Sequence, residues 1–307
     1  MTPSAIFLTG PTASGKTALA MQLYRRLPIE LISVDSALVY RGMNIGTAKP
    51  TPTELAQVPH HLIDIRDIPE TYSAAQFRQD ALRCIAEITQ RGHIPLLVGG
   101  TGLYFRALRD GLAPLPAADP ELRAELQHRL QTQGLAALRA ELGQVDPTAA
   151  AHVQDSQRVL RALEVWYKTG MPLSMLQRQQ SQRMPYQSLT LVCAPAERNI
   201  LHQRIHERFA HMLALGLEEE VAGLMTRPDL HPELPALRAV GYRQIWAYLA
   251  GDGTRSDMIM RSEAATRQLA KRQLTWLRTE TTAHWLPETG AARLDHTLTL
   301  IRQFSNG

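Results

Sequence analysis

A glycine-rich segment near the start of the chain constrains the fold more than any other feature. Residues 10–17 read GPTASGKT and match the pattern GxxxxGK[ST] at every fixed position. The segment follows a short apolar run at residues 5–8 and precedes a helical pattern that opens at Thr17, as a phosphate-binding P-loop requires. Its N–H groups would surround a di- or triphosphate, its lysine would neutralise charge, and Thr17 would hold Mg²⁺. The predicted phosphate-binding residues are Gly10, Pro11, Thr12, Ala13, Ser14, Gly15, Lys16 and Thr17.

Further apolar runs predict a parallel sheet around this loop. Residues 29–34 and 94–98 are typical of buried strands, and residues 73–90 between them show the pattern of an amphipathic helix with Ser73 as its N-cap. Strands that alternate with helices indicate an α/β fold with a doubly wound parallel sheet, here a P-loop core. In such folds ligands bind at the carboxyl ends of the strands.

A helical insertion interrupts this pattern. After the proline-rich joint at residues 113–120 the sequence predicts helices at residues 120–133, 134–142 and 156–168, the last ended by Gly170 and Pro172, and a strand resumes at residues 189–194. Strand signals on both sides of a helical segment indicate an insertion. We therefore expect a catalytic core of residues 1–113 and 188–307, with a helical C-terminal part, and an inserted helical domain of residues 114–187.

Composition excludes several other classes of protein. Of 307 residues, 44% are hydrophobic, which excludes a disordered chain, and the net charge of +4 decides little about partners. Cys84 and Cys193 are too few for a disulfide framework or a cysteine-based zinc site. Adjacent histidines at 60 and 61 face different ways in a regular element, which disfavours a metal pair. With no membrane-spanning apolar stretch, we expect a cytoplasmic monomer with no protein partner and no membrane contact.

Two polar residues follow predicted strands and should lie in the crevice of the P-loop. Asp35 follows the second strand, and its residue type allows a Mg²⁺ ligand, a helix cap or a general base. Thr101 lies in the glycine-rich turn at residues 99–102 and either positions the same reacting group or only completes the turn.

Several longer segments carry a resemblance to a known family. They include SVDSALVYRGMNIGTAKP, GGTGLYFRAL, RFAHMLALGLEEEV, RAVGYRQIW and ATRQLAKRQLTWLR, in order between about residues 6 and 285. Together they resemble the bacterial tRNA dimethylallyltransferases, the adenosine-37 isopentenyltransferases. That family transfers the dimethylallyl group of dimethylallyl diphosphate to N6 of the adenosine beside the tRNA anticodon and releases diphosphate with the help of Mg²⁺. The resemblance implies that Asp35 accepts the N6 proton, Arg208 binds the diphosphate and Thr101 lies near the target base.

The same resemblance implies a tRNA-binding surface. Residues 261–278 contain five cations against the single acid Glu263, and Arg267 and Lys271 share one helix face. Trp276 has a helical spacing more typical of core packing than of base stacking. The inserted helices are expected to close over the anticodon stem-loop. The implied tRNA contacts are Asp35, Ser36, Ala37, Leu38, Thr101, Arg123, Gln157, Arg158, Val159, Leu160, Arg161, Val240, Gly241, Tyr242, Arg243, Gln244, Ile245, Lys271, Arg272, Gln273, Trp276 and Arg278.

Two other functions fit parts of the sequence. The first hundred residues would also suit a P-loop kinase of small molecules, in which Asp35 binds Mg²⁺ or activates a hydroxyl. A non-enzymatic RNA-binding protein with a nucleotide switch is the second alternative. A P-loop also allows ATP binding, and the sequence leaves open whether ATP occupies it.

Overall fold

The computed structural model describes residues 4–178, 182–287 and 290–306. The chain forms two compact units, one of Met1–Leu108 with Met184–Gly307 and the other of Arg109–Arg183. The second unit starts earlier than the expected 114, inside helix α4 (Gly102–Asp110), and it ends before the expected 187. The physical reason for the second difference is that Met184 is buried in the apolar core of the first unit.

A six-stranded parallel sheet forms the centre of the first unit, with strand order β3-β2-β4-β1-β5-β6. Its long strands are β1 (Ser4–Thr9), β2 (Ile29–Val34), β4 (Ile94–Gly99) and β5 (Gln187–Val192). The predicted α/β class and the strand after the insertion are confirmed, although β5 is shifted from the expected 189–194. The edges of the sheet are the short strands β3 (His60–His61) and β6 (His284–Trp285). Each has only two residues, too few for an alternating pattern that would predict a strand from the sequence.

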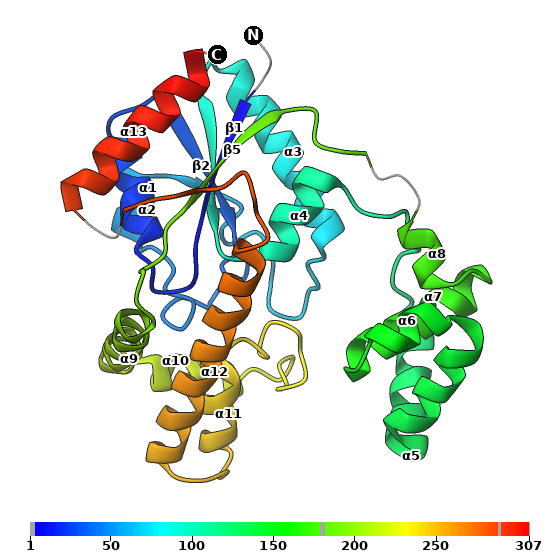
Figure 1. Cartoon of the computed structure of the whole chain (residues 1–307). Helices are drawn as coiled ribbons and strands as arrows, with labels where there is room; N and C mark the ends of the chain where they lie inside the picture. Colours follow the sequence, from blue (N-terminus) through cyan, green and yellow to red (C-terminus); the bar gives the residue numbers. More distant parts are fainter. Residues whose placement is uncertain (1–3, 179–181, 288–289, 307) are drawn as a thin grey trace. The chain divides into compact units, whose positions relative to one another are not determined.

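Alternate side chains of β1 pack against helices on opposite faces of the sheet. Ile6 and Leu8 meet α1 (Lys16–Tyr24) and α13 (Gly290–Asn306) in one apolar cluster. Ala5 and Phe7 meet α3 (Ala74–Gln90) and α4 in another. Figure 1 shows α1 and α13 on one side of the strands and α3 and α4 on the other. The predicted Ser73 cap of α3 is confirmed, because its side chain accepts the N–H of Gln76.

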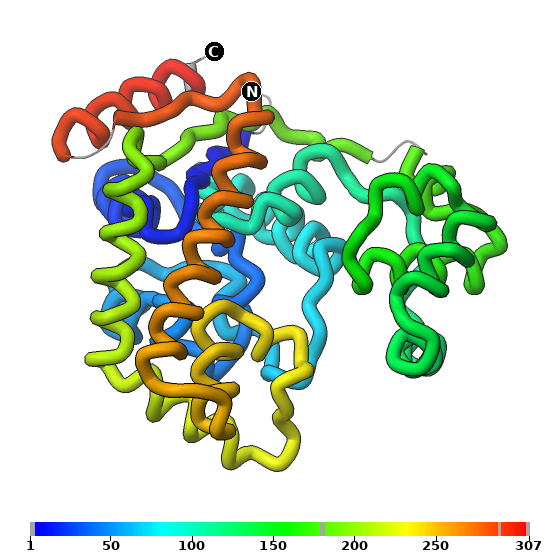
Figure 2. The backbone as a smooth tube through the Cα atoms, turned by 60° about the horizontal axis from the view of Figure 1, so that its bottom comes forward, coloured from blue at the N-terminus to red at the C-terminus, as the bar shows by residue number. Residues whose placement is uncertain are grey.

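Four helices lie beyond the carboxyl ends of the strands (Figure 1). They are α9 (Arg198–Ala214), α10 (Leu217–Met225), α11 (Tyr242–Leu249) and α12 (Arg255–Leu277). The long helices α9 and α12 run side by side, as Figure 2 shows. The short helix α2 (Pro52–Gln57) begins at a capping box formed by Thr51 and Glu54. Within the described ranges, no helix is both long and apolar enough to cross a membrane.

The second unit is a helical bundle with its own apolar core. It contains α5 (Pro120–Val145), α6 (Pro147–His152), α7 (Ser156–Thr169) and α8 (Leu173–Gln177). Gly134 interrupts α5 with φ 80° and ψ 164°, so two helices meet at the predicted position. Gly170 ends α7 in a left-handed conformation, also as predicted. Leu126 and Leu142 of α5 pack with Val159 and Leu163 of α7 in this core.

Candidate active site

The P-loop, residues 10–17, connects β1 to α1 at the carboxyl end of the sheet. Gly10 is required by a close approach, since a Cβ there would lie 2.1 Å from the carbonyl oxygen of Cys193. Gly15 adopts φ 86° and ψ 11° at the N-cap of α1, a conformation that favours glycine. The first N–H groups of α1 have no partner within the helix, and they are available to an anion.

Lys16 stands at the start of α1 with its charge in a buried setting. Its Nζ donates to the carbonyl oxygen of Pro11 at 3.2 Å. Burial, the strongest influence, and the nearby cation Arg208 lower the pKa of Lys16 to about 8, and the negative charge of Asp35 opposes them. Lys16 therefore remains mostly charged at pH 7 but titrates in an accessible range.

Arg208 of α9 lies in the same group of charges. Burial lowers the pKa of its guanidinium, and the charge of Asp35 opposes that effect. Arg208 makes no hydrogen bond and no ion pair within the part of the chain that the structure describes. The structure thus brings three of the predicted residues within electrostatic reach of one another, and the Arg208 side chain forms no ion pair with the described residues.

Asp35 follows β2 and uses one carboxylate oxygen to shape the chain after it. Oδ1 accepts the N–H groups of Ala37 at 2.8 Å and Leu38 at 3.3 Å. Among the described residues Oδ2 has no hydrogen-bond partner. The capping role that the residue type allows is therefore observed at Oδ1, and the second oxygen is available for a proton.

Thr101 connects the glycine-rich turn at residues 99–102 to the end of β2 and the segment that follows it. Its Oγ1 accepts the N–H of Ser36 at 3.2 Å, and its own N–H donates to the carbonyl oxygen of Val34 at 3.3 Å. A Cβ at Gly99 would lie 2.0 Å from that same Val34 oxygen, so the turn depends on glycine for its approach to β2. These contacts fix Thr101 beside the segment that carries Asp35.

Gln273 of α12 has a structural role that the sequence does not reveal. Its Oε1 accepts the N–H of Thr12 at 2.9 Å, and its Nε2 donates to the carbonyl oxygen of Gly100 at 2.9 Å. A Cβ at Gly100 would lie 2.4 Å from that Nε2. Both ends of the amide are engaged inside the protein, so Gln273 joins the P-loop to the turn that holds Thr101, and its contact with tRNA stays a prediction.

Trp276, one turn further along α12, also packs inside the protein. Its ring stacks on Phe105 with 6.0 Å between centroids, and a Cβ at Gly102 would lie 2.7 Å from the indole. The packing agrees with the spacing of this residue in the sequence. A tRNA contact through its ring would need this stack to open, so we omit Trp276 from the proposed RNA surface.

The remaining predicted RNA contacts of the first unit fall into two groups, exposed cations and buried or partly buried residues. Lys271, Arg272, Arg278 and Arg243 are exposed, and their side chains make no hydrogen bond or ion pair in the described ranges. Val240 is partly buried, whereas Gly241, Tyr242, Gln244 and Ile245 are buried. The buried residues belong to the packing of α11, and the tRNA contact of residues 240–245 stays a prediction. Ser36 is exposed, with Ala37 and Leu38 partly buried beside it.

A buried carboxylate organises the predicted contacts of the second unit. Glu164, whose side chain is 1% exposed, accepts Nε of Arg123 at 3.0 Å, Nη1 of Arg161 at 2.7 Å and the N–H of Asp119 at 2.8 Å. Burial raises its pKa, but these bonds outweigh burial and lower it overall. Arg123 and Arg161 are therefore held in ion pairs, a role the sequence did not indicate.

Other predicted residues of α7 fall on two faces. Gln157 and Arg158 are exposed, and Arg158 pairs with Asp155 at 3.3 Å. Val159 and Leu160 are buried in the core of the unit, and the tRNA contact predicted for residues 157–161 stays a prediction. Helical periodicity explains the two faces, because consecutive residues of a helix cannot all lie on one side of it.

The residues present fit a Mg²⁺ ion that is held mainly by substrate. Thr17 is exposed and its hydroxyl has no partner among the described residues. No cluster of three or more carboxylate, histidine or cysteine ligands occurs in those residues. A P-loop ion needs no such cluster, since its ligands are a Thr hydroxyl, phosphate oxygens and water.

The parallel sheet, the GxxxxGK[ST] loop between β1 and α1, and the charges around it define a P-loop α/β protein. Residues 38–280 match the family described as IPP transferase. The chain therefore belongs to the IPP transferase family, a family of prenyltransferases.

Solved structures agree with this assignment. The full-length tRNA isopentenylpyrophosphate transferase from Bacillus halodurans is 37% identical, with 99% of this chain and 96% of that chain covered and a TM-score of 0.71. The tRNA delta(2)-isopentenylpyrophosphate transferase from Staphylococcus epidermidis is 32% identical, with coverage of 98% and 99% and a TM-score of 0.70. A eukaryotic dimethylallyltransferase acting on tRNA is 25% identical, with coverage of 99% and 79% and a TM-score of 0.81.

Proposed function

We propose that this protein transfers the dimethylallyl group of dimethylallyl diphosphate to N6 of adenosine-37 in tRNA and releases diphosphate. The tRNA transferases from Bacillus and Staphylococcus, alike over nearly the whole chain, support tRNA as the substrate. The observation that carries the chemistry is the grouping of Lys16, Arg208 and Asp35 beside the P-loop. Two cations suit a leaving diphosphate, and one carboxylate suits a departing proton.

The P-loop side of the site serves the leaving group. The N–H groups at the start of α1, Lys16 and Arg208 bind the diphosphate and stabilise the negative charge that grows as the allylic C–O bond breaks. No phosphoryl group is transferred, so this part of the site only binds and neutralises. Mg²⁺, when held by the Thr17 hydroxyl and phosphate oxygens, supplies additional positive charge there.

The Asp35 side of the site serves the acceptor. As the N6–C bond forms and the C–O bond breaks, the bonding electron pair leaves with diphosphate, and Oδ2 of Asp35 takes the proton from N6. The Oδ1 bonds to Ala37 and Leu38 hold the carboxylate in place for that transfer. Thr101, fixed against Ser36, lies beside the base and orients it.

Binding of tRNA depends on the exposed cations. Adenosine-37 must leave the anticodon stack, which costs a few kcal/mol, and phosphate contacts offset that cost. Lys271, Arg272 and Arg278 of the α12 region provide such contacts in the first unit. In the second unit Arg158 and Gln157 serve the anticodon stem-loop in the same way.

Transfer of label tests this function directly. Purified protein is incubated with unmodified tRNA and labelled dimethylallyl diphosphate, with Mg²⁺ and without ATP. Label should appear in the RNA with the native protein and should fall to background with Lys16→Ala. Absence of label in RNA together with ATP-dependent phosphorylation of a small molecule would instead establish a kinase. A nucleotide switch that only binds RNA would show neither reaction.

A further inference from the structure

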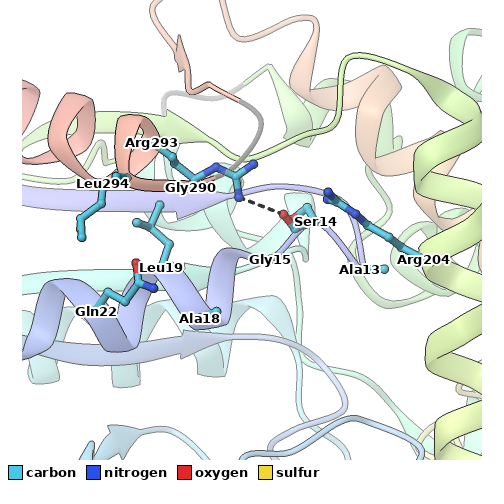
Figure 3. Close-up of a pocket in the computed structure, with 11 residues that line it drawn as sticks. Ala13, Ser14, Gly15, Ala18, Leu19, Gln22, Arg204, Gly290, Arg293 and Leu294 are labelled. Atoms are coloured by element: carbon cyan, nitrogen blue, oxygen red, sulfur yellow. Dashed lines mark hydrogen bonds between the residues drawn. The ribbon is translucent and has the colours of Figure 1, made fainter.

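The two sides of the proposed active site are held by different contacts. On the P-loop side, Nη1 of Arg293 in α13 donates to the carbonyl oxygen of Ser14 at 3.3 Å, as Figure 3 shows. On the acceptor side, Asp35 begins a segment of turns and irregular backbone, residues 35–49, that runs from the end of β2 toward α2. Such a segment must satisfy its backbone groups through contacts other than a helix or a sheet. The contacts that hold the 35–49 segment therefore also determine where Asp35 lies.

Glu220 of α10 holds the far end of the 35–49 segment. Its Oε2 accepts the N–H groups of Asn44 at 3.1 Å and Ile45 at 2.8 Å. Its Oε1 accepts the N–H of Gly46 at 3.3 Å. Successive backbone N–H groups that converge in this way form a binding site for an anion, and bonds from them to a carboxylate are stronger than bonds between neutral groups. The protein supplies the anion here from its own helix α10.

Tyr242, the first residue of α11, completes this cluster. Its hydroxyl donates to Oε1 of Glu220. Burial, and then the negative charge of Glu220, raise the pKa of Tyr242, so the hydroxyl keeps the proton that it donates. A Cβ at Gly46 would lie 2.4 Å from the Tyr242 ring, so the segment packs directly against α11. The cluster thus fixes the 35–49 segment to two helices at once.

A continuous series of hydrogen bonds connects this cluster to Asp35. Oδ1 of Asn44 accepts Nζ of Lys49 at 3.0 Å, and the same Nζ donates to the carbonyl oxygen of Tyr40 at 2.7 Å. The N–H of Tyr40 donates to the carbonyl oxygen of Ala37 at 3.2 Å, and the N–H of Ala37 donates to Oδ1 of Asp35 at 2.8 Å. The Lys49 side chain is only 4% exposed, so this link is held inside the protein. A shift at the far end of the segment therefore changes where the carboxylate of Asp35 lies.

We propose that Glu220 is a positioning residue for the transfer reaction, which holds the 35–49 segment against α10 and α11 so that the carboxylate of Asp35 is aligned with N6 of the acceptor adenosine. Glu220 touches no reacting atom and acts through Asp35. A small misplacement of a catalytic group is enough to slow a reaction strongly. The inference rests on the proposed function, because it takes Asp35 to be the general base.

A double-mutant cycle with Asp35 tests this role. Glu220→Gln keeps the shape of the side chain but turns amide N–H groups toward backbone or hydroxyl donors. Label transfer is measured in a single turnover with saturating tRNA and dimethylallyl diphosphate, and both the rate constant and the amplitude are recorded. Glu220→Gln should lower the rate constant about tenfold in the native protein. In the Asp35→Asn protein it should lower the rate constant by less than about twofold further, because there is no carboxylate left to align.

Glu219→Gln is the matched control, since it makes the same chemical change at the adjacent, exposed position of α10. It should leave the rate constant within about twofold in both backgrounds. Tyr242→Phe provides a second and milder test of the cluster, because it removes the hydroxyl donor and keeps the ring against Gly46. It should lower the rate constant by a smaller factor than Glu220→Gln, again only while Asp35 is present. Calorimetry with inorganic diphosphate should give a dissociation constant within about twofold of the native value for both cluster variants, as expected if the P-loop side remains folded.

The cycle separates the positioning role from other roles. A tenfold loss from Glu220→Gln in both backgrounds would overturn the inference, because Glu220 would then act on something other than Asp35. A lower amplitude with an unchanged rate constant would also overturn it, since the residue would then only keep the protein folded. A slow Asp35→Asn protein with a fully active Glu220→Gln protein would overturn the positioning role alone. A native rate constant in Asp35→Asn would overturn the proposed general base and the inference together.

Discussion

The side-chain amide of Gln273 accepts a hydrogen bond from the backbone N–H of Thr12, 261 positions away in the chain. Its other end donates to Gly100. One residue of α12 thus sets the separation between the P-loop and the turn that carries Thr101. The same helix exposes Lys271 and Arg272, so the surface proposed for tRNA and the frame of the active site share one rigid element.

Replacing Gln273 should affect catalysis more than tRNA binding. Gln273→Ala removes two hydrogen bonds that hold the site together, and we expect the turnover number to fall by about tenfold. The dissociation constant for tRNA should change by less than about twofold, since the amide is not free for RNA. Steady-state kinetics and filter binding measure the two quantities. Gln268→Ala, at an exposed position of α12, is the control, and a larger loss in tRNA affinity than in turnover would mean that Gln273 acts mainly in binding tRNA.

Asp35→Asn tests the general base without disturbing the turn. Asparagine retains an Oδ1 that accepts the N–H groups of Ala37 and Leu38, so the local geometry should persist. Turnover should fall about 10²–10⁴-fold, with tRNA affinity nearly unchanged. Rapid-quench measurement of label transfer and a parallel binding assay give both values. Equal losses in the two assays would mean that Asp35 acts only in binding.

The lowered pKa of Lys16 predicts a pH-dependent affinity for diphosphate. With its pKa at about 8, Lys16 loses its charge as the pH rises through 8, whereas a bound anion favours the charged form. Binding of diphosphate should therefore weaken from pH 7 to pH 9, by at most about tenfold per pH unit. Lys16→Arg is the control, because a guanidinium stays charged there and leaves only the titration of diphosphate itself. Parallel profiles for the two proteins would contradict the assigned role of Lys16.

Neutralising exposed cations of α12 should change the salt dependence of tRNA binding. Lys271→Ala combined with Arg272→Ala should weaken binding and reduce the slope of log K against log salt by about 0.7–0.9 for each RNA phosphate that the protein no longer neutralises. Binding measured between low and physiological salt provides the slope. Arg25→Ala with Arg26→Ala removes the same charge from exposed positions after α1 and should leave the slope as it is. Equal slopes for both double variants would remove α12 from the RNA surface.

Glu164 should be important for the stability of the second unit. Glu164→Gln removes the buried negative charge that Arg123, Arg161 and the Asp119 N–H share, and we expect a loss of about 1–3 kcal/mol in that unit. Urea unfolding followed by hydrogen exchange of α5 and α7 separates this loss of stability in the second unit from any change in the stability of the first unit. Asp155→Asn, which breaks only the exposed pair with Arg158, should cost far less.

Local patterns in the sequence predicted the fold well. The P-loop, the alternating strands and helices, the Ser73 cap, the break at Gly134 and the stop at Gly170 each depend on neighbouring residues, and the structure contains all of them. The sheet edges β3 and β6 are too short to carry a period, and only their pairing with longer strands defines them.

The candidate site was harder to predict in detail. The positions of Asp35 and Thr101 follow from strand ends, but the proximity of Arg208 to Lys16 required the family resemblance, because the two residues are distant in sequence. The roles of Gln273 and Glu164 depend on a few hydrogen bonds to residues distant in the sequence, which leave no mark on composition or periodicity. Motif segments also include buried neighbours such as Val159 and Ile245, whose side chains support the elements and do not reach solvent.

Leu108 and Met184, the residues at which the chain leaves and re-enters the first unit, belong to one apolar cluster of its core. The second unit, Arg109–Arg183, is therefore a folded insertion in a single loop of the first unit. The entropic cost of closing a loop rises only slowly with its length. The stability of the first unit should therefore change little when this segment is lengthened, shortened or exchanged. The helical unit can therefore diverge in sequence and size without destabilising the sheet and its P-loop.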